Sequence, residues 1–493
     1  MAIFNYHHAA ITIPKFSQFS FPPTGQPPPL APTPTPSSIM RPFNIPENIY
    51  AAALDPRVPL TIATVYAITA TALTWYNRSR NKRPWAISKT RAFYAFVILH
   101  NVALAVYSAW TFWGMLGVMH RSVRYPWRPG GLPAMLDGFC RMHGPGRLGA
   151  SLYYHEDSGR WLSADASSMV DALDASGTPI GTPMGRIWSE GLDYYGWIFY
   201  LSKFYEVLDT FIILAKGKPS SILQTYHHSG AMMCMWAGMR FMSAPIWMFA
   251  TVNSLIHAFM YTYYTLTALT IKVPMRIKRT LTTMQIIQFI LGAFFATLHL
   301  FVTYLTPITI PRRDGPGMPA SPTDSGIPVA SGVFGSVKQL LFGPVLDETS
   351  PVISMSPLQP SSSMMTETVY VAQQCIVTRG ETFAIWLNTI YLAPLTYLFV
   401  SFFIASYVKR REAGQKANGK AKRNDNVTMA EKAGWDAARG VGKVVYGSDG
   451  SISPITPISP ASSVSPASPA SPVVISKGPP SPKKANGRAR RRL

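Results

Sequence analysis

Residues 195–215, YGWIFYLSKFYEVLDTFIILA, decide the fold class of this chain. About 20 mostly apolar residues in a helix are enough to cross the roughly 30 Å hydrocarbon core of a bilayer. The segment also carries Lys203, Glu206 and Asp209, which share one side of a helix because they recur every third residue. A charge at mid-bilayer costs roughly 2.5–3.5 kcal/mol, so these groups should face the protein interior. There they would form an ion-pair set that joins helices, the wall of a polar cavity, or both.

Six further segments are apolar enough and long enough to cross a bilayer. With the first, they lie at 59–76, 92–118, 195–215, 221–242, 245–271, 282–306 and 382–408. The composition agrees, because only 14% of residues are charged and the mean hydropathy is positive despite long Pro/Ser tracts. We therefore predict an all-α, polytopic membrane protein with seven transmembrane helices.

Basic residues gather in alternate loops between these segments. They are Arg78, Arg80, Lys82, Arg83, Lys89 and Arg91; Lys216 and Lys218; Lys272, Arg276, Lys278 and Arg279; and Lys409, Arg410 and Arg411. Because cytosolic loops are enriched in Lys and Arg, we expect a lumenal N-terminus and a cytosolic C-terminus. The sequons at Asn77 and Asn426 should then carry no glycan. The same clustering points to membrane topology, and not to nucleic-acid binding, as the source of the net charge of +22.

The ends of the chain and two insertions differ in composition from the apolar segments. Residues 1–54 are rich in Pro, Ser and Thr and are predicted to form a disordered arm, with no secretory signal peptide. Residues 55–411 should form the membrane domain, interrupted by lumenal loops at 119–190 and 311–381. Residues 412–493 are predicted to be a disordered, basic, Ser/Pro-rich tail.

Polar side chains recur in four of the predicted helices. They are Lys203, Glu206 and Asp209; Gln224, His227 and His228; Asn253, His257, Tyr261 and Tyr264; and Gln285 and Gln288. At a rise of 1.5 Å per residue these groups reach overlapping depths below the cytosolic side. The overlap predicts one water-accessible cavity. His100 and His299 are expected instead to be interhelical hydrogen-bond partners.

These residues fall into four blocks. The blocks read KFYEVLDT at 203–210, QTYHH at 224–228, NSLIHAFMYTYY at 253–264 and TMQIIQF at 283–289. In this order, each on a predicted helix, they closely resemble the signature blocks of the ELO family of very-long-chain fatty-acid elongases. The resemblance is strongest over about 193–300, weaker over 55–118 and 382–411, and absent from the arm, the insertions and the tail.

One residue departs from the pattern of the family. Many members have a histidine where this chain has Gln224. The change leaves His227 and His228 in place, so the implied activity is not affected. An amide does not titrate, which predicts a tuning or positioning role for Gln224.

The resemblance implies an enzyme of fatty-acid elongation. Such a 3-ketoacyl-CoA synthase condenses acyl-CoA with malonyl-CoA, releases CO2 and gives a 3-ketoacyl-CoA two carbons longer. It also implies an endoplasmic reticulum membrane location and a site that faces the cytosol. Acyl-CoA, malonyl-CoA and membrane lipids are the expected partners, no metal or other cofactor is expected, and contacts with other enzymes of the cycle or with a second copy stay open.

The chemistry needs a group that holds the acyl chain while the second substrate reacts. A neutral imidazole can serve as that nucleophile, and His227 is our candidate. His228 would orient its neighbours, while His257 and Asn253 would polarise the thioester or stabilise the enolate. The residues expected to shape the site and position the substrates are Lys203, Glu206, Asp209, Gln224, Tyr261, Tyr264, Gln285 and Gln288.

The three cysteines are not expected to take part. Cys140, Cys234 and Cys375 are far apart and show no metal-like spacing, so they predict no disulfide framework. Cys234 lies two turns beyond His227 without an evident base, which argues against a thiol nucleophile.

Two other functions fit parts of the pattern. A di-iron membrane desaturase or hydroxylase would use His227 and His228 as part of a histidine box, but this chain has no second box to complete the ligand set. A seven-helix lipid receptor or transporter would use the polar groups as a binding pocket, and it leaves their arrangement in four blocks unexplained.

Overall fold

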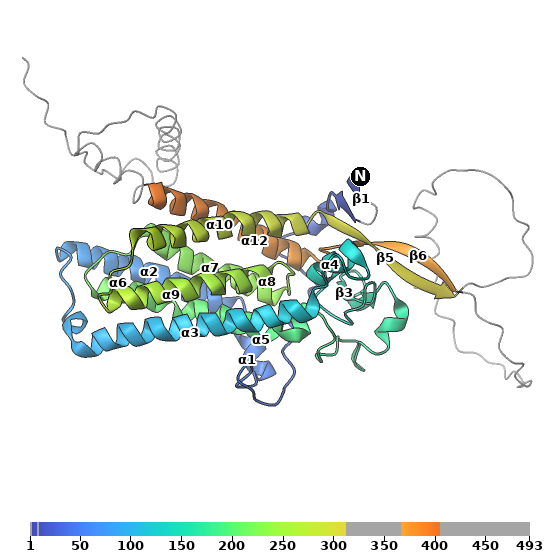
Figure 1. Ribbon diagram of the computed structural model, residues 1–493, viewed down its shortest axis with the longest axis horizontal. Helices are drawn as coiled ribbons and strands as arrows, with labels where there is room; N and C mark the ends of the chain where they lie inside the picture. Colours follow the sequence, from blue (N-terminus) through green and yellow to red (C-terminus); the bar gives the residue numbers. More distant parts are fainter. Residues whose placement is uncertain (1, 7–8, 312–365, 405–493) are drawn as a thin grey trace, which may run out of the picture. The chain divides into compact units, whose positions relative to one another are not determined.

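A computed structural model describes residues 2–6, 9–311 and 366–404 of the 493-residue chain (Figure 1). The predicted tail at 412–493 and most of the insertion at 311–381 lie outside the described residues. Residues 55–311 and 366–404 of the predicted membrane domain and residues 9–54 of the arm are described.

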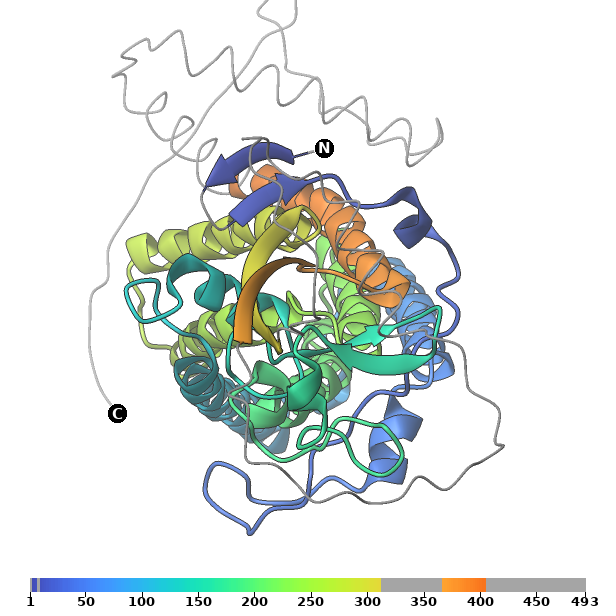
Figure 2. The ribbon, with the colours of Figure 1, turned by 90° about the vertical axis from the view of Figure 1, so that its right-hand side faces the viewer.

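Helices lie side by side and form a bundle (Figures 1 and 2). In chain order, the helices of the bundle are α2 (Arg57–Ser79), α3 (Arg91–Ser122), α5 (Asp193–Tyr205), α6 (Val207–Ala215), α7 (Ile222–Arg240), α8 (Ile246–Met248), the π-helix η5 (Phe249–Asn253), α9 (Ser254–Ala268), α10 (Met275–His299) and α12 (Arg379–Phe403). The other helices are η1 (Phe16–Phe19), α1 (Glu47–Ala53), η2 (Ala86–Lys89), α4 (Gly131–Cys140), η3 (Ala166–Met169) and η4 (Trp188–Leu192).

Four of these helices are long and apolar enough to cross a membrane, namely α2, α3, α10 and α12. They confirm that helices occur at the predicted segments 59–76, 92–118, 282–306 and 382–408. The segments 195–215 and 245–271 are each divided into shorter helices, at Glu206 and around the π-helix η5. The prediction is wrong at the end of 282–306, where α10 stops at His299 and residues from Val302 onward form a strand.

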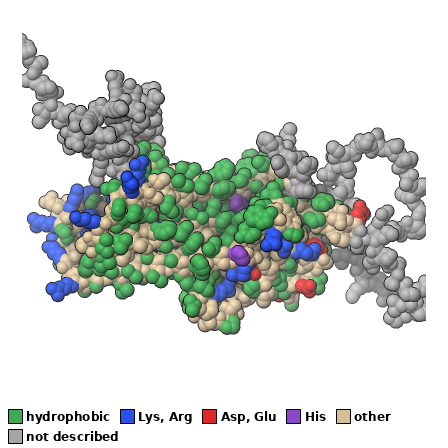
Figure 3. Space-filling view, in the orientation of Figure 1, with side chains coloured by type: hydrophobic (Ala, Val, Ile, Leu, Met, Phe, Trp, Pro, Cys, Tyr) green, Lys and Arg blue, Asp and Glu red, His purple; other side chains and the backbone are tan. Residues whose placement is uncertain are grey.

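The surface of the bundle suits a lipid environment. Large apolar side chains on the outer helices are exposed, among them Leu60, Leu99, Trp113, Ile290 and Phe294. In Figure 3 a broad apolar belt covers the middle of the bundle. Among the described residues on this face, Lys and Arg side chains gather without Asp or Glu at one end, whereas toward the other end they occur together with Asp and Glu. The first of these ends holds the connections from α2 to α3 and from α9 to α10, and the sheets lie at the other end (Figure 1). An exposed apolar belt of this size is expected where lipid, and not water, is the solvent.

The first 54 residues differ from the disordered arm that their composition predicts, since residues 9–54 are placed against the bundle. Because Pro-rich backbone pairs few of its own carbonyl groups, donors must come from elsewhere. Aromatic side chains of the bundle supply them: Trp188 to Leu30, Trp110 to Ile39, Tyr195 to Met40, Tyr200 to Ala53 and Trp236 to Leu54, at 2.7–3.0 Å. Composition could not reveal these donors, because they lie more than 70 residues away in sequence.

The two insertions are also structured where they are described, so the fold is not purely α-helical. Strands β3 (Leu152–His155) and β4 (Arg160–Ser163) form an antiparallel hairpin. Strands β1 (Ala2–Tyr6), β2 (Ala9–Thr12), β5 (Val302–Pro311) and β6 (Thr366–Gln374) form a second sheet in the order β1-β2-β5-β6, with Thr303 opposite Gln374 and Ile310 opposite Glu367. These strands gather at the end of the bundle that faces the viewer in Figure 2.

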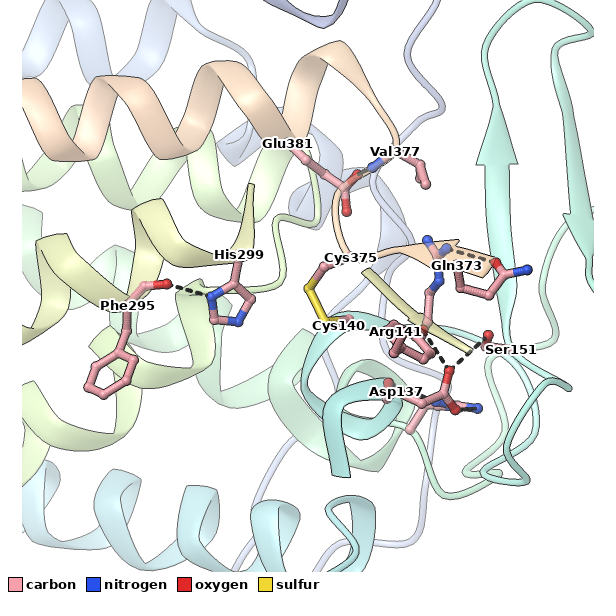
Figure 4. Close-up of a disulfide and its surroundings, with 12 residues drawn as sticks. Asp137, Cys140, Arg141, Ser151, Phe295, His299, Gln373, Cys375, Val377 and Glu381 are labelled. Carbon is pink, nitrogen blue, oxygen red and sulfur yellow. Dashed lines mark hydrogen bonds and ion pairs between the residues drawn. A yellow bond between two sulfur atoms is a disulfide. The ribbon is translucent and has the colours of Figure 1, made fainter. Parts of the chain in front are cut away.

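A disulfide joins the two insertions, contrary to the expectation from cysteine spacing. Cys140 at the end of α4 is bonded to Cys375 just after β6, across 235 residues of sequence (Figure 4). Arg141 donates a hydrogen bond to Gln373 beside it, at 3.0 Å. The spacing of cysteines in the sequence indicates disulfides only in short, cysteine-rich chains. In this chain the tertiary fold brings the two distant cysteines together.

A buried ion pair forms the polar centre of the first insertion. Arg186 contacts Asp137 at 2.6 Å, and both side chains are buried. Tyr304 of β5 donates to the same carboxylate at 2.8 Å, which ties the first insertion to the strand that pairs with β6. His143 lies between Trp161 and Trp188, and burial together with the Arg186 guanidinium lowers its pKa to about 3.

Asn77 has a structural role that the sequon does not reveal. Its amide donates to the backbone carbonyl of Leu214 at 2.8 Å and accepts from Trp85 at 2.8 Å, which ties α2 to the end of α6. Since this side chain is buried, it would resist glycosylation on either side of a membrane. Asn426 lies outside the described residues.

The disulfide gives a simple labelling test. After denaturation without reductant, only Cys234 should react with a maleimide mass tag, whereas all three cysteines should react after reduction. Gel shifts under the two conditions measure the number of tags. Cys234→Ser is the matched control and should take no tag before reduction. Three tags on the unreduced wild type would contradict the disulfide.

Candidate functional site

An ion pair lies at the centre of the polar groups. Lys203 on α5 donates to Glu206 at 2.6 Å, and both side chains are almost fully buried. Ser202 donates to the same carboxylate oxygen at 3.1 Å. Lys203 also reaches the side-chain oxygen of Asn253 at 3.4 Å, so the pair contacts a second helical segment. The carboxylate therefore has the partners that a buried charge requires.

The π-helix η5 brings the fifth predicted segment to this pair. η5 ends at Asn253, one turn before His257 on α9. The Nδ1 atom of His257 lies 3.6 Å from the Oε1 atom of Glu206. A π-turn inserts one extra residue into a helix and turns the following side chains, a feature common at functional sites. As a result, Asn253 contacts Lys203, and His257 lies next to Glu206.

Asp209 belongs to a separate network. Glu206 is the residue between α5 and α6, and Asp209 lies in the first turn of α6. Tyr261 donates to Asp209 at 2.6 Å, and the Nε2 atom of His100 lies 2.8 Å from its other oxygen. The Nδ1 atom of His100 lies 3.2 Å from the Tyr205 hydroxyl. The predicted interhelical hydrogen bond of His100 is confirmed, but His100 also joins a site residue.

Tyr205 and His100 were not among the candidate site residues. A histidine within a long apolar segment was the available signal for His100. His299 was expected to make a similar interhelical bond, and that expectation is wrong, because its Nδ1 atom bonds to the carbonyl of Phe295 in its own helix at 2.6 Å (Figure 4).

Gln224 and His228 lie beside α2. The amide of Gln224 donates to Thr210 at 3.1 Å, and Thr210 also contacts the Tyr66 hydroxyl at 2.8 Å. Tyr66 presents its ring to His228 edge-on, with ring centres 6.1 Å apart. The Nδ1 atom of His228 is buried and has no hydrogen-bond partner within the described part of the chain. Gln224 thus joins α7 to α6, and its positioning role stays a prediction.

His227, one turn along α7 from Gln224, faces α12. Its Nδ1 atom lies 2.9 Å from the hydroxyl of Tyr391, and the same hydroxyl donates to the backbone carbonyl of His227 at 3.0 Å. The rings of His227 and His228 lie 5.4 Å apart. Tyr391 is a site residue that the sequence did not indicate, since one tyrosine in an apolar segment is unremarkable.

A cavity begins at His227. It contains about 670 Å³ of empty space, part of it open to the surroundings, between α5, α7, η5, α10 and α12. Lys203, His227, Asn253, Gln288 and Tyr391 form its polar end, and two further polar residues, Ser243 and Asn388, line it elsewhere. The apolar lining includes Phe199, Met235, Ile246, Phe249, Ala296 and Ile385. Along α7 the lining continues from His227 to Gly238, which is 11 residues or about 16 Å.

Several predicted residues lie outside this lining. Tyr264 is 40% exposed. Gln285 donates to the sulfur of Met260 at 3.3 Å and does not line the cavity. His228 and His257 lie behind the lining and contact the polar networks. Cys234 does line the cavity, and its thiol points to the carbonyl of Leu387 at 3.9 Å, with no base beside it.

The donor set does not resemble a metal centre. Among the described residues, no group of three or more His, Cys, Asp or Glu side chains lies close enough together to hold a metal ion. The histidines instead have hydroxyl, carboxylate or aromatic neighbours. This arrangement suits acid–base or nucleophilic chemistry on an organic substrate.

A family model described as the GNS1/SUR4 family (ELO) matches residues 51–415. This chain belongs to the ELO family. The match includes all four sequence blocks, both insertions and the helix that carries Tyr391. It begins near the end of the arm, so most of the segment held by the aromatic donors lies outside it.

Named relatives support the same assignment. The chain is 35% identical over 105 residues to the human very long chain fatty acid elongase 3, which covers 21% of this chain and 39% of that protein. It is 30% identical over 188 residues to the human very long chain fatty acid elongase 1, which covers 36% of this chain and 64% of that protein. Fatty acid elongase 2 of Trypanosoma brucei brucei is 32% identical over 134 residues, 27% of this chain and 48% of that protein. The chain thus matches less than two thirds of the length of each of these ELO relatives.

The ion pair predicts a non-additive effect on stability. Lys203→Met or Glu206→Gln alone should lower the free energy of unfolding by about 3–5 kcal/mol, because each leaves a buried group without its partner. The double variant should lose at least about 1 kcal/mol less than the sum of the two single variants. Thermal unfolding in detergent measures all three. Lys216→Met, which removes an exposed cation after α6, is the control and should have little effect. Additive losses would show that the two side chains are not coupled.

Proposed function

We propose that this protein is a fatty-acid elongase that condenses acyl-CoA with malonyl-CoA to give 3-ketoacyl-CoA and CO2. The position of His227 supports this most directly, since it places an imidazole where the polar end of the cavity meets an apolar channel. The polar end suits the reacting carbonyl groups, and the channel suits an acyl chain. Membership of the ELO family and the names of the relatives point to the same reaction.

The reaction proceeds in two steps through an acyl group on His227. A lone pair of the imidazole attacks the thioester carbon, the carbon–sulfur bond breaks, and CoA leaves as a thiolate that takes a proton from water. Malonyl-CoA then loses CO2, and the electron pair of the broken carbon–carbon bond forms an enolate. The enolate attacks the acyl carbon, and the bond to the imidazole breaks with return of its electron pair to the ring.

Asn253 polarises the carbonyl group that reacts. Its side-chain oxygen faces Lys203, which leaves the two N–H donors of the amide for the cavity that Asn253 lines. Donors fixed in place beside a carbonyl stabilise the negative charge that develops on its oxygen. His257 and Glu206 hold this arrangement from behind, and Gln288 contributes an amide to the same wall.

The two alternative functions receive less support. A di-iron oxidase needs about eight ligands, chiefly imidazoles, while the described histidines are dispersed over several networks. A receptor or transporter needs a pocket but no nucleophile, and it gives no reason for the imidazole at the head of the channel.

We further propose seven transmembrane helices in the endoplasmic reticulum membrane, with a lumenal N-terminus and a cytosolic C-terminus. The basic end of the bundle would be cytosolic (Figure 3). The disulfide between the insertions would then lie in the lumen, where the oxidising environment preserves such bonds. Acyl-CoA and malonyl-CoA would enter from the cytosol, without a metal or other cofactor.

The covalent step can be observed directly. Incubation with acyl-CoA alone, followed by an acid quench and peptide mass analysis, should find an acyl group on His227. His227→Ala should abolish both the adduct and elongation from radiolabelled malonyl-CoA. His299→Ala, on the same chain but outside the cavity, should retain both activities. A wild-type protein that elongates acyl-CoA without forming the adduct would contradict the two-step scheme.

The topology has an independent test. Ser176→Asn creates a sequon with Gly177 and Thr178 in an exposed turn of the first insertion. The variant should gain a glycan that endoglycosidase removes, because this turn is proposed to be lumenal. Adding Thr178→Ala destroys the sequon and should abolish the shift. An unmodified Ser176→Asn variant would contradict the proposed orientation.

A further inference from the structure

The hydroxyl of Tyr391 contacts two atoms of His227. It lies 3.0 Å from the backbone carbonyl oxygen of His227 and 2.9 Å from its ring Nδ1 atom. A tyrosine hydroxyl carries one proton and accepts through its oxygen, whereas a carbonyl oxygen can only accept. The hydroxyl proton must therefore point to the carbonyl, and the hydroxyl oxygen must receive a proton from Nδ1.

This count assigns the tautomer of the imidazole. With the proton on Nδ1, the lone pair of a neutral His227 lies on Nε2. In the reverse arrangement the hydroxyl would donate to Nδ1, and two oxygen atoms would face each other at 3.0 Å without a proton. His227 lines the cavity, and no hydrogen bond of its Nε2 atom occurs among the described residues.

The surroundings of Tyr391 fix its hydroxyl in this position. A Cβ atom on Gly230 of α7 would lie 2.1 Å from the Tyr391 ring, so only glycine lets the ring come this close to α7. Tyr226 stacks on Tyr391 with ring centres 5.5 Å apart. The Tyr226 hydroxyl also donates to the backbone carbonyl of Tyr391 at 3.2 Å, so α7 and α12 are linked in both directions.

We propose that Tyr391 is a positioning residue that holds His227 in the Nδ1–H tautomer and so makes Nε2 the nucleophile. The proposal rests on the proposed acyl transfer to His227. Nε2 bonds to the acyl carbon as the carbon–sulfur bond breaks, which gives a cationic acyl-imidazole and CoA thiolate. The enolate then takes the acyl group, and the electron pair returns to Nε2. The proton stays on Nδ1 throughout, donated to the hydroxyl oxygen of Tyr391, so neither step requires a proton transfer at His227.

Tyr391→Phe tests this assignment, because it removes the hydroxyl and keeps the ring between Gly230 and Tyr226. Single-turnover acylation by acyl-CoA alone should be followed on the full-length protein in detergent. The saturating rate of adduct formation should fall about 10- to 100-fold, the effect of leaving a buried hydrogen bond unmade. The acyl-CoA concentration that gives half the maximal rate should stay within about twofold of the wild-type value, because the variant does not change how the substrate binds before it reacts.

Thr389→Val is the matched control. It removes a hydroxyl of the same helix that bonds to Thr297 of α10 at 3.2 Å, away from the cavity lining. Its acylation rate should equal that of the wild type. Nitrogen-15 spectra of ring-labelled histidine should show a protonated Nδ1 on His227 in the wild type and in Thr389→Val, and a shift toward the other tautomer in Tyr391→Phe.

The outcomes separate this proposal from the proposed function. An adduct that forms on wild type and on Tyr391→Phe at equal saturating rates overturns the role of Tyr391 and leaves the elongase assignment intact. If Tyr391→Phe changes only the acyl-CoA concentration that gives half the maximal rate, the proposal is also overturned. That result would mean that Tyr391 affects substrate binding through the structure and not the reactivity of His227. No adduct on a wild-type protein that is turning over overturns the covalent scheme and this inference together.

Discussion

The ion pair between Lys203 and Glu206 is the constraint on which the rest of the bundle depends. Two charges within an apolar helix are tolerated only if every polar partner they need lies close by. Ser202, Asn253 and His257 meet that need, and two of them come from a different helical segment. The need to satisfy this pair therefore fixes how α5 meets η5 and α9, and with it the position of Asn253 at the head of the cavity.

The polar groups divide the interior into parts with different tasks. The Asp209 network with His100 and Tyr261 joins α6 to α3 and α9 and stays away from the cavity. The channel beyond His227 is lined mainly by apolar side chains, with Ser243 and Asn388 as polar exceptions. A reacting carbonyl needs polar donors and an acyl chain needs an apolar surface, so this arrangement suits the proposed condensation.

The end of the bundle that carries the insertions is built by a different kind of interaction. The disulfide, the Asp137–Arg186 pair and the bond from Tyr304 to Asp137 connect segments distant in sequence. The arm at 9–54 is fixed by aromatic donors that bond to its backbone carbonyls. These contacts hold the insertions and the arm against the bundle.

The sequence alone determined the helical segments, because apolar length and the cost of intramembrane charge are local properties of the chain. It also determined that His227, Lys203 and Asn253 belong to one site, since four helices carry polar groups at similar depths. Only the tertiary structure decided the rest. The pairing of Cys140 with Cys375, the order of the arm, the separation of Asp209 from Glu206 and the contact of Tyr391 with His227 all depend on which helix faces join. Hydropathy does not encode that choice, because one tyrosine or cysteine has no periodicity and its partner lies on another element.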